Sequence, residues 1–247
     1  MAWVTKSSEE QYTPEPAPRE YTKQEKARNW WHYHWVMVLV AVIVAVILGW
    51  LIHDMFFRVQ PDVEIGYVGP QRLPEATVQS LQEALAPYCS DLNGDGQVVV
   101  QISEFTLDFA TSESADPYSQ LAGTTQLSAA LTPGSDTHLF LIADPANFQA
   151  QTQSLQYTDG TLPDDAHIND WQKMVYRWSD CPLLAGLDLG DCSNYIASAE
   201  TAGSSQDLLS GLYIGLRGDW EGKASASYTA SADLWTALTA GAVPLEE

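Results

Sequence analysis

An acidic stretch, DLNGDGQVVVQ at residues 91–101, has the side-chain spacing of the first half of a calcium-binding loop. Asp91, Asn93 and Asp95 alternate as the oxygen ligands do at positions 1, 3 and 5 of an EF-hand loop. Gly96 suits the sharp turn at position 6, and Gln97 could offer its backbone carbonyl at position 7. Calcium is therefore the one cofactor that the sequence suggests, with Asp91, Asn93, Asp95 and Gln97 as its ligands.

The second half of that calcium pattern is missing. Position 12, which an EF-hand loop fills with a bidentate glutamate, is Ile102, and the residues that follow are strand-like rather than helical. A remote acid would have to complete the ligand shell. The alternative is a plain turn, because Asx turns at Asp91 and Asn93 and a positive φ at Gly96 can join a helix to a strand without a metal.

The three cysteines, Cys89, Cys181 and Cys192, all follow the long apolar segment of the chain. Cys181 and Cys192 flank PLLAGLDLGD, a short loop rich in turn-forming residues, and an exported location permits a disulfide. We predict that these two pair and that Cys89 is buried at the end of its helix. A bridge closing a loop of about 12 residues contributes about 3 kcal/mol in the chain-entropy model. Three reduced thiols are the alternative.

Motifs of catalysis are missing from the chain. It contains no G-x-S-x-G, no P-loop and no H-E-x-x-H. Residues 58–247 hold 26 acids, so pairs of neighbouring acidic residues are expected by chance. The pairs are Asp164/Asp165, Asp188/Asp191 and Asp219/Glu221. The five histidines, His32, His34, His53, His138 and His167, form no useful cluster. We therefore expect a protein that is not an enzyme.

The negative charge lies almost entirely in the second part of the chain. Residues 58–247 carry six basic and 26 acidic residues, a net −20 out of −21 for the whole chain. Phosphate backbones need a basic face, so we expect no nucleic-acid partner. An anionic lipid surface should repel this part for the same reason.

One segment is apolar enough to cross a bilayer. Val36–Ile52, VMVLVAVIVAVILGWLI, holds 17 residues without a charge. As a helix it spans about 25 Å, and flanking apolar residues can lengthen it. Aromatic residues mark both ends, as they do at membrane interfaces; they are Trp30, Trp31, Tyr33 and Trp35 on one side and Trp50, Phe56 and Phe57 on the other.

Positive charge predicts the orientation of this segment. Arg19, Lys23, Lys26 and Arg28 precede it, whereas Arg58 and Arg72 are the only basic residues within about 20 positions after it. The N-terminus should stay in the cytoplasm, with residues 58–247 outside the cell. A cleaved signal peptide is the alternative, but no small-residue cleavage site follows the apolar run, so an uncleaved signal anchor fits better.

These observations divide the chain into three parts. Residues 1–29 contain too few apolar residues for a core and predict a disordered cytoplasmic tail, although residues 23–28, KQEKAR, could extend the membrane helix. Residues 30–57 form the transmembrane helix with its aromatic belts. Residues 58–247 form the acidic exoplasmic domain.

The exoplasmic part alternates between strand-like and helix-like stretches. We expect strands at 63–67, 98–109, 138–143 and 212–216, and helices after Pro74, after Asp116, after Asp144 and from Ser231 to a stop at Gly241. The order predicts an α/β domain with an open, largely parallel sheet. Such a sheet binds ligands at the carboxyl ends of its strands, here near Val68–Gln71, Asp108–Ser112 and Ala143–Asp144.

Two details of the pattern carry further expectations. The apolar positions change parity between Ile102 and Phe105, which predicts a bulge near Ser103–Glu104. Farther on, an i, i+3, i+4, i+7 stripe predicts a core-facing helix; its members are Trp171, Met174, Val175 and Trp178.

Three stretches behind the membrane anchor carry a resemblance: VEIGYVGPQRLPEATVQSLQEALAPYCSDLNGDGQVVVQISEFTLDF, then HLFLIADPANFQ, then LLSGLYIGLRG. Over roughly residues 60–150 and 207–217 the chain resembles single-pass, membrane-anchored exoplasmic proteins of Gram-positive bacteria, whose domains are distantly similar to extracellular solute-binding proteins. The resemblance implies a solute-binding-like fold in which FLIADPANF completes the first lobe. No ligand residue carries over from it.

Two functions follow as hypotheses. The first is a non-catalytic binding or sensing module that is held at the cell membrane and meets a small molecule at the carboxyl ends of its strands. The second is a structural or assembly subunit that meets a membrane protein partner and has no small-molecule site. In both cases the bilayer itself is a partner of the apolar segment.

Overall fold

The computed structural model describes residues 20–57, 60–109, 117–196, 199–220, 222 and 224–245. The chain divides into two units, Met1–Arg58 and Val59–Glu247, and each is described here by itself. Most of the predicted tail, residues 1–19, and the predicted helix start at Asp116 fall outside the described residues.

The first unit contains one long helix, α1 (Lys23–Phe57). A capping box begins it: the Thr22 backbone N–H donates to Glu25 Oε2 at 3.0 Å, and the Glu25 N–H donates to Thr22 Oγ1 at 3.4 Å. Its part from Lys23 to His53 is long and apolar enough to cross a membrane. The helix includes residues 23–28, the extension that the sequence allowed, so the described end of the predicted tail is helical.

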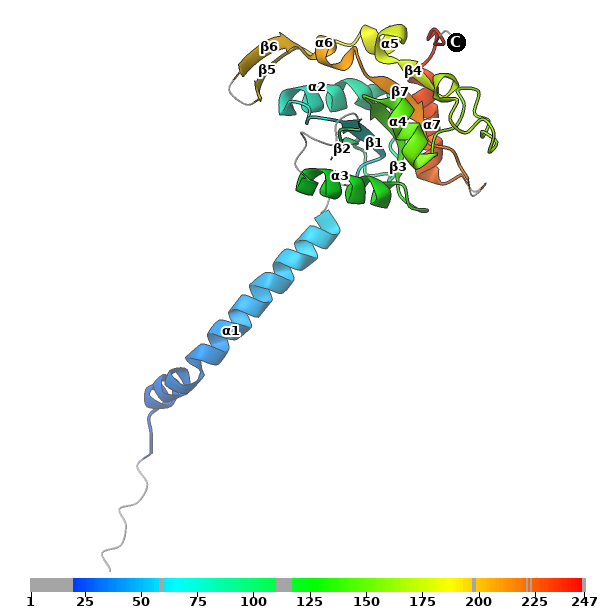
Figure 1. The fold of residues 1–247 in the computed structure, drawn as a ribbon. Helices are drawn as coiled ribbons and strands as arrows, with labels where there is room; N and C mark the ends of the chain where they lie inside the picture. The colour runs from blue at the N-terminus through cyan, green and yellow to red at the C-terminus, as the bar shows by residue number, and fades with distance from the viewer. Residues whose placement is uncertain are drawn as a thin grey trace, which may run out of the picture. The chain divides into compact units, whose positions relative to one another are not determined.

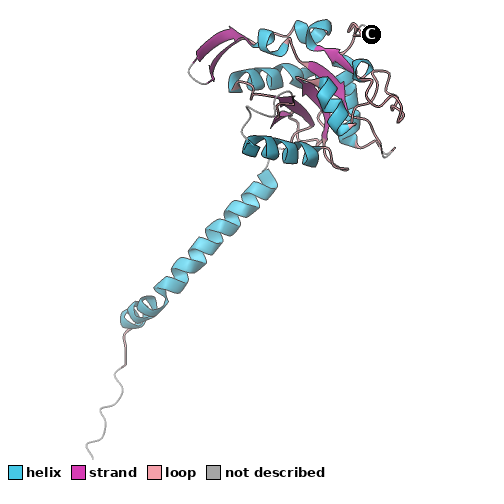
Figure 2. Cartoon of the chain, in the orientation of Figure 1, coloured by secondary structure: helices cyan, strands magenta, loops and turns pink. Residues whose placement is uncertain are grey.

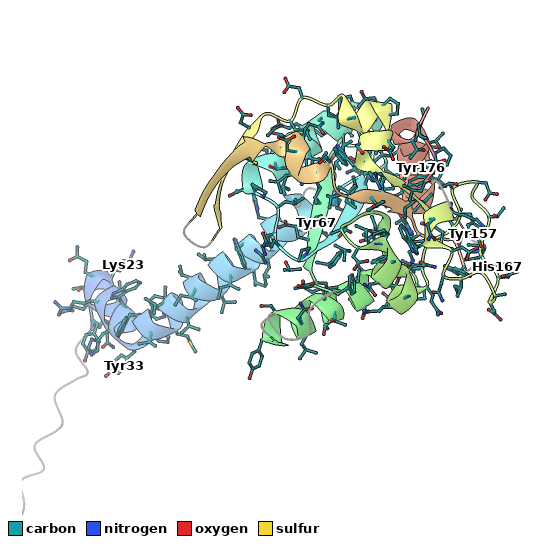
Figure 3. All side chains as sticks on the ribbon, turned by 45° about the horizontal axis from the view of Figure 1, so that its top comes forward. Lys23, Tyr33, Tyr67, Tyr157, His167 and Tyr176 are labelled. Atoms are coloured by element: carbon teal, nitrogen blue, oxygen red, sulfur yellow. The ribbon has the colours of Figure 1, made fainter. Side chains whose placement is uncertain are left out.

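Aromatic side chains at the N-terminal end of α1 pack on one another along the helix. Trp30 and His34, one turn apart, stack with ring centroids 5.0 Å apart, and His34 Nδ1 lies 2.9 Å from the Trp30 carbonyl oxygen. His32 meets Tyr33 edge to face, and Figure 3 shows Lys23 and Tyr33 projecting from this end of α1. The aromatic residues predicted as an interfacial belt thus lie on one continuous helix.

The second unit is built on a five-stranded sheet with the order β2-β1-β3-β7-β4 (Figure 1). Its strands are β1 (Val63–Gly69), β2 (Val100–Thr106), β3 (Thr137–Ile142), β4 (Val175–Arg177) and β7 (Tyr213–Leu216). Strands β1, β2 and β3 are parallel, whereas β7 runs antiparallel to both β3 and β4. The α/β class is confirmed, and the sheet is mixed rather than largely parallel.

Helices cover both faces of this sheet. One face carries α2 (Glu75–Leu85), α5 (Pro182–Ala185), α6 (Ser205–Leu209) and α7 (Ala226–Leu238), whose apolar residues share a first core with Ile65, Leu139 and Ile214. The other face carries α3 (Pro117–Ala130) and α4 (Pro145–Thr152), which share a second core with Val68, Phe140 and Ile142. Figures 1 and 2 show α2 and α3 on opposite sides of the strands. A two-stranded hairpin, β5 (Asp191–Ile196) and β6 (Ala199–Ser204), is separate from the sheet.

The two-sided core explains why the predicted bulge in β2 is wrong. Strand β2 pairs with β1 in unbroken register from Val100 to Thr106. Its apolar residues change parity because Ile102 belongs to the first core and Phe105 to the second. A parity change signals a bulge only where one face of a strand is buried. The irregular register lies instead between β1 and β3, where His138 is passed over.

Two other local expectations need correction. The stripe from Trp171 to Trp178 is core-facing, but it forms the short strand β4 between two 3₁₀ turns, η2 (Trp171–Lys173) and η3 (Trp178–Asp180), because pairing with β7 overrides the helical pattern. Helix α7 begins earlier than predicted. Ser225 is its N-cap, accepting from the Tyr228 N–H at 3.0 Å, and Ser231 is buried within the helix.

Candidate ligand-binding site at the carboxyl edge of the sheet

The parallel strands create a crevice between β1 and β3. The chain leaves β1 through α2 on the first-core face, and it leaves β3 through α4 on the second-core face. The connections therefore diverge at the carboxyl ends of two neighbouring strands. Open α/β sheets bind ligands at such a switch point.

A small pocket of about 170 Å³ lies at this position. Its lining residues come from the ends of all three parallel strands: Val68, Gly69, Pro70, Leu107, Asp108, Phe109, Ala143 and Asp144. The three strand ends predicted from the sequence thus meet in one place. Gln71 is not among the lining residues, and residues 110–112 lie outside the described part of the chain.

Backbone hydrogen bonds hold the walls of this pocket together. The Leu107 N–H donates to the Gly69 carbonyl at 2.8 Å, and the Ala143 N–H donates to the Val68 carbonyl at 2.9 Å. These bonds extend the sheet ladder just past its last regular pairs. The walls of the pocket are therefore continuous with the hydrogen-bonded sheet.

Two polar side chains, one buried and one half-buried, hold the loop after β1 in place. The Tyr67 hydroxyl donates to the Gln71 carbonyl at 2.9 Å, and Glu104 Oε1 accepts from the Leu73 N–H at 2.7 Å. Burial, together with the negative charge of Glu104, raises the pKa of Tyr67 to about 12. Tyr67 lies within the sheet (Figure 3) and stays a neutral donor throughout the physiological range.

The residues that line the pocket are mostly apolar, and two of them are acidic. Val68, Leu107 and Phe109 are apolar lining residues of the pocket, and Asp108 and Asp144 are the acidic residues that line it. Asp144 also caps α4: its oxygens accept from the Asn147 N–H at 3.1 Å and from Asn147 Nδ2 at 2.7 Å. An apolar body with a cationic or donor group matches such a lining.

The predicted calcium loop folds as a series of Asx turns. Asp91 accepts from the Gly94 and Gly96 N–H groups at 2.6 and 2.9 Å. Asn93 and Asp95 each accept from the N–H two residues on, both at 2.8 Å. Gly96 has the positive φ that the sequence predicted, 84°. The side-chain oxygens of the loop therefore bind its own backbone, as the metal-free alternative requires.

A residue that the sequence did not point to, Asp62, ties this loop to the sheet. As a whole residue, Asp62 is 2% exposed. One oxygen accepts from the Leu92 N–H at 2.7 Å and the Asn93 N–H at 3.3 Å, and the other accepts from the Val99 N–H at 2.8 Å.

Among the residues described, no group of three or more His, Cys, Asp or Glu side chains is placed to hold a metal ion.

We expect the loop to keep its shape without calcium, because its own N–H groups satisfy the oxygens. Calorimetry of the full chain in detergent with millimolar calcium should give no binding heat, and adding a chelator should leave the melting temperature unchanged. Heat that disappears in both Asp91→Ala and Asp95→Ala variants would instead establish a site.

The three cysteines are free thiols in the structure. Cys181 and Cys192 are buried, and Cys192 Sγ donates to the Gly203 carbonyl at 3.4 Å. Cys89 is half-buried at the end of the α2 region, where its thiol donates to the Leu85 carbonyl at 3.6 Å. Burial raises the pKa of Cys89 and of Cys181 to about 11, so both react slowly with thiol reagents at neutral pH.

The Cys181–Cys192 disulfide stays a prediction for the exported protein. Non-reducing peptide mapping of protein purified from its membrane should give one peptide pair joined through these two residues, with Cys89 alkylated. Recovery of all three cysteines as alkylated thiols without prior reduction would reject the bridge.

A second pocket, of about 210 Å³, lies where β3 begins and β7 ends. His138 lines it, with Nε2 3.5 Å from Ser227 Oγ and its ring edge-on to Tyr228. Its Nδ1 is buried and has no hydrogen-bond partner among the described residues. Burial, and next the charge of Arg217, lower the pKa of His138. A serine nucleophile needs a base whose other nitrogen is oriented by a third group, and no described residue fills that role here.

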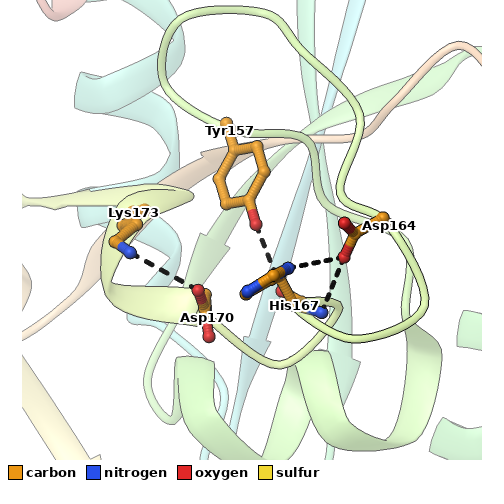
Figure 4. Close-up of polar contacts among 5 residues, drawn as sticks. All are labelled: Tyr157, Asp164, His167, Asp170 and Lys173. Atoms are coloured by element: carbon orange, nitrogen blue, oxygen red, sulfur yellow. Dashed lines mark hydrogen bonds and ion pairs between the residues drawn. The ribbon is translucent and has the colours of Figure 1, made fainter.

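Asp164, from the first of the acidic pairs noted in the sequence, serves local folding. Asp164 accepts from the His167 N–H at 2.9 Å and lies 2.6 Å from His167 Nδ1 (Figure 4). This hydrogen bond lowers the pKa of Asp164. The Tyr157 hydroxyl donates to the His167 carbonyl at 3.2 Å. The groups are exposed, and they shape the irregular segment before β4 rather than a buried site. Glu221, of the pair with Asp219, lies outside the described residues.

No protein-family model matches the chain, and no curated protein or solved structure is significantly similar to it.

Proposed function

We propose that the chain is a membrane-anchored, non-catalytic binding or sensing module whose exoplasmic domain takes a small ligand at the β1/β3 switch point. The observation that carries the proposal is the pocket formed there by the ends of three parallel strands. Its apolar walls and acidic corners favour a compact ligand with an amine or another donor group.

The anchor supports the same proposal. Helix α1 is long and apolar enough to cross a bilayer, and basic residues precede it along the chain. In the proposed topology the N-terminus is cytoplasmic, the helix is an uncleaved signal anchor and residues 58–247 are extracellular. A distant similarity of this domain to extracellular solute-binding proteins is part of the same proposal.

Filling the pocket tests the ligand site. Ala143 lines the pocket and is small, so an Ala143→Leu variant should occupy the space without removing a hydrogen-bonding side chain. The full chain in detergent would be screened by thermal shift against ethanolamine, choline and phenethylamine. We expect at least one amine to raise the melting temperature of the unaltered chain and not that of Ala143→Leu.

The matched control is Ala129→Leu, because Ala129 is exposed on α3 and gains the same side chain away from the pocket. It should retain the shift. Shifts of equal size in Ala143→Leu would contradict the proposed site. Absence of any shift, with co-purification of a defined membrane protein, would favour the assembly subunit instead.

Protease accessibility tests the orientation. On intact cells, or on protoplasts where a wall blocks access, protease should remove the domain from residue 58 onward and spare the N-terminal residues. A protected domain with cleavage inside residues 1–22 would overturn the proposed topology. Release of the whole domain into the medium without protease would point to a cleaved signal peptide.

A further inference from the structure

A larger cleft lies at the same edge of the sheet, beside β4 and β7. It has a volume of about 590 Å³, within the range of small-molecule sites. We call it the Arg177 cleft and define it by six of its lining residues: Trp171, Arg177, Asp180, Tyr213, Val243 and Leu245. None of them lines the switch-point pocket.

Strand pairing positions the cation of this cleft against an aromatic ring. Arg177, the last residue of β4, is directly opposite Tyr213, the first residue of β7. Residues opposite each other in an antiparallel pair project from the same face. The Arg177 guanidinium accordingly lies 5.6 Å from the centre of the Tyr213 ring, and Nη2 donates to the Tyr213 hydroxyl at 3.4 Å.

Two aromatic rings form one wall of the cleft. Trp171 and Tyr213 are half-buried, with centroids 6.0 Å apart and planes at 88°. Their inner parts pack against the second core, which fixes them in place. Val243 and Leu245 supply apolar surface from the C-terminal segment, and the Val243 N–H donates to the Asp180 carbonyl at 3.1 Å, which ties that segment to η3.

The Arg177 guanidinium has N–H donors available for a ligand. Its side chain is exposed, and none of the described acids lies within ion-pair distance of it, although the charge of Asp180 acts on it from farther away. A guanidinium carries five N–H donors in a planar fork that matches a carboxylate, whereas the Tyr213 hydroxyl takes one of them. Contact with the Tyr213 ring restrains the guanidinium, so less entropy is lost when an anion binds.

We infer that the Arg177 cleft binds a small aromatic monocarboxylate. The ligand carboxylate pairs with the Arg177 guanidinium, and its ring packs on Trp171 and Tyr213. Asp180 lines the same cleft, and its negative charge acts on Arg177. It opposes every anion that enters the cleft, and it opposes a dianion more strongly than a monoanion. The inference rests on side chains that the switch-point proposal does not use, so either can fail alone.

Calorimetry of the full chain in detergent tests the inference, with phenylacetate as the probe and phenylacetamide and cyclohexylacetate as neutral and non-aromatic comparisons. Phenylacetate should bind with millimolar affinity or better, and each comparison compound should bind at least about threefold more weakly. Arg177→Gln should weaken phenylacetate by about tenfold or more, since it loses the charge and the planar fork.

Two control variants distinguish phenylacetate binding in the Arg177 cleft from a general effect of positive charge and from binding in the switch-point pocket. Arg72→Gln removes an exposed cation elsewhere, and Ala143→Leu fills the switch-point pocket; both should bind phenylacetate as the unaltered chain does. Three results would each overturn the inference. They are unchanged phenylacetate affinity in Arg177→Gln, equal affinity for phenylacetate and phenylacetamide, and no binding heat at phenylacetate concentrations of about 10 mM.

Discussion

Replacing Asp62 by alanine is expected to lower the free energy of unfolding of the sheet domain by about 3 kcal/mol. The Asp62 carboxylate is buried and accepts from the Leu92, Asn93 and Val99 N–H groups. Removing it leaves these donors without a partner where the loop enters β2. Urea unfolding of the full chain in detergent, followed by a domain-sensitive probe such as near-ultraviolet circular dichroism, measures the loss.

Asp62→Asn separates the charge from the shape of this side chain. The amide keeps one acceptor oxygen but presents an NH₂ group where the second oxygen stood, so we expect a loss of about 2 kcal/mol. Asp165→Ala, which removes an exposed acid from a loop, is the control and should change stability by less than about 0.5 kcal/mol. An Asp62→Ala variant as stable as this control would contradict the role given to Asp62.

The same carboxylate predicts a pH dependence. Burial raises the pKa of Asp62, but hydrogen bonds from Val99, Leu92 and Asn93 outweigh it and hold the pKa below its ordinary value. The group is therefore more acidic folded than unfolded. Its stabilisation is present above the pKa of an unfolded aspartate, about 3.9, and is lost as the pH falls through the lower folded value. The stability gap between the unaltered chain and Asp62→Asn should narrow below about pH 4.

Arg217→Ala is expected to cost about 3 kcal/mol. Its guanidinium caps the C-terminus of α3 by donating to the carbonyls of Leu131 at 2.7 Å and of Ala130 and Thr132 at 3.3 Å. It also donates to Ser135 Oγ at 2.9 Å. The last carbonyls of a helix have no partner within the helix, and a cation there also meets the negative end of the helix dipole. Removing the side chain takes away the hydrogen bonds that join the end of α3 to the residue after β7.

An Arg217→Lys variant shows whether the end of α3 is stabilised by the planar guanidinium or by the positive charge alone. Lysine keeps the charge but cannot reach several carbonyls in one plane, so we expect it to recover less than half of the loss in urea unfolding. Arg72→Ala removes an exposed arginine and should be near neutral. Full recovery by lysine would mean that charge alone stabilises the helix end, and a neutral Arg217→Ala would refute the capping role.

Local features of the fold were predictable from the sequence, because they depend on residues close together in the chain. The long apolar helix, the helix that Asp144-Pro145 opens and the positive φ of Gly96 follow from composition, capping and turn chemistry. The continuous apolar run of β3 is typical of a strand covered on both faces, and the structure places Leu139 in one core and Phe140 in the other. From that order of elements, the meeting of three strand ends at one pocket could be predicted as well.

Only the tertiary structure decided the features that depend on distant partners. Pairing with β7 turned the helical stripe around Met174 into a strand, and the same pairing brought Arg177 beside Tyr213 across 36 positions of sequence. Asp62 and Arg217 look like two more charged residues in an acidic domain until the fold places loop N–H groups around one and helix carbonyls around the other. Hydrogen bonds of this kind depend on where remote backbone groups arrive, and residue type and spacing along the chain do not encode that.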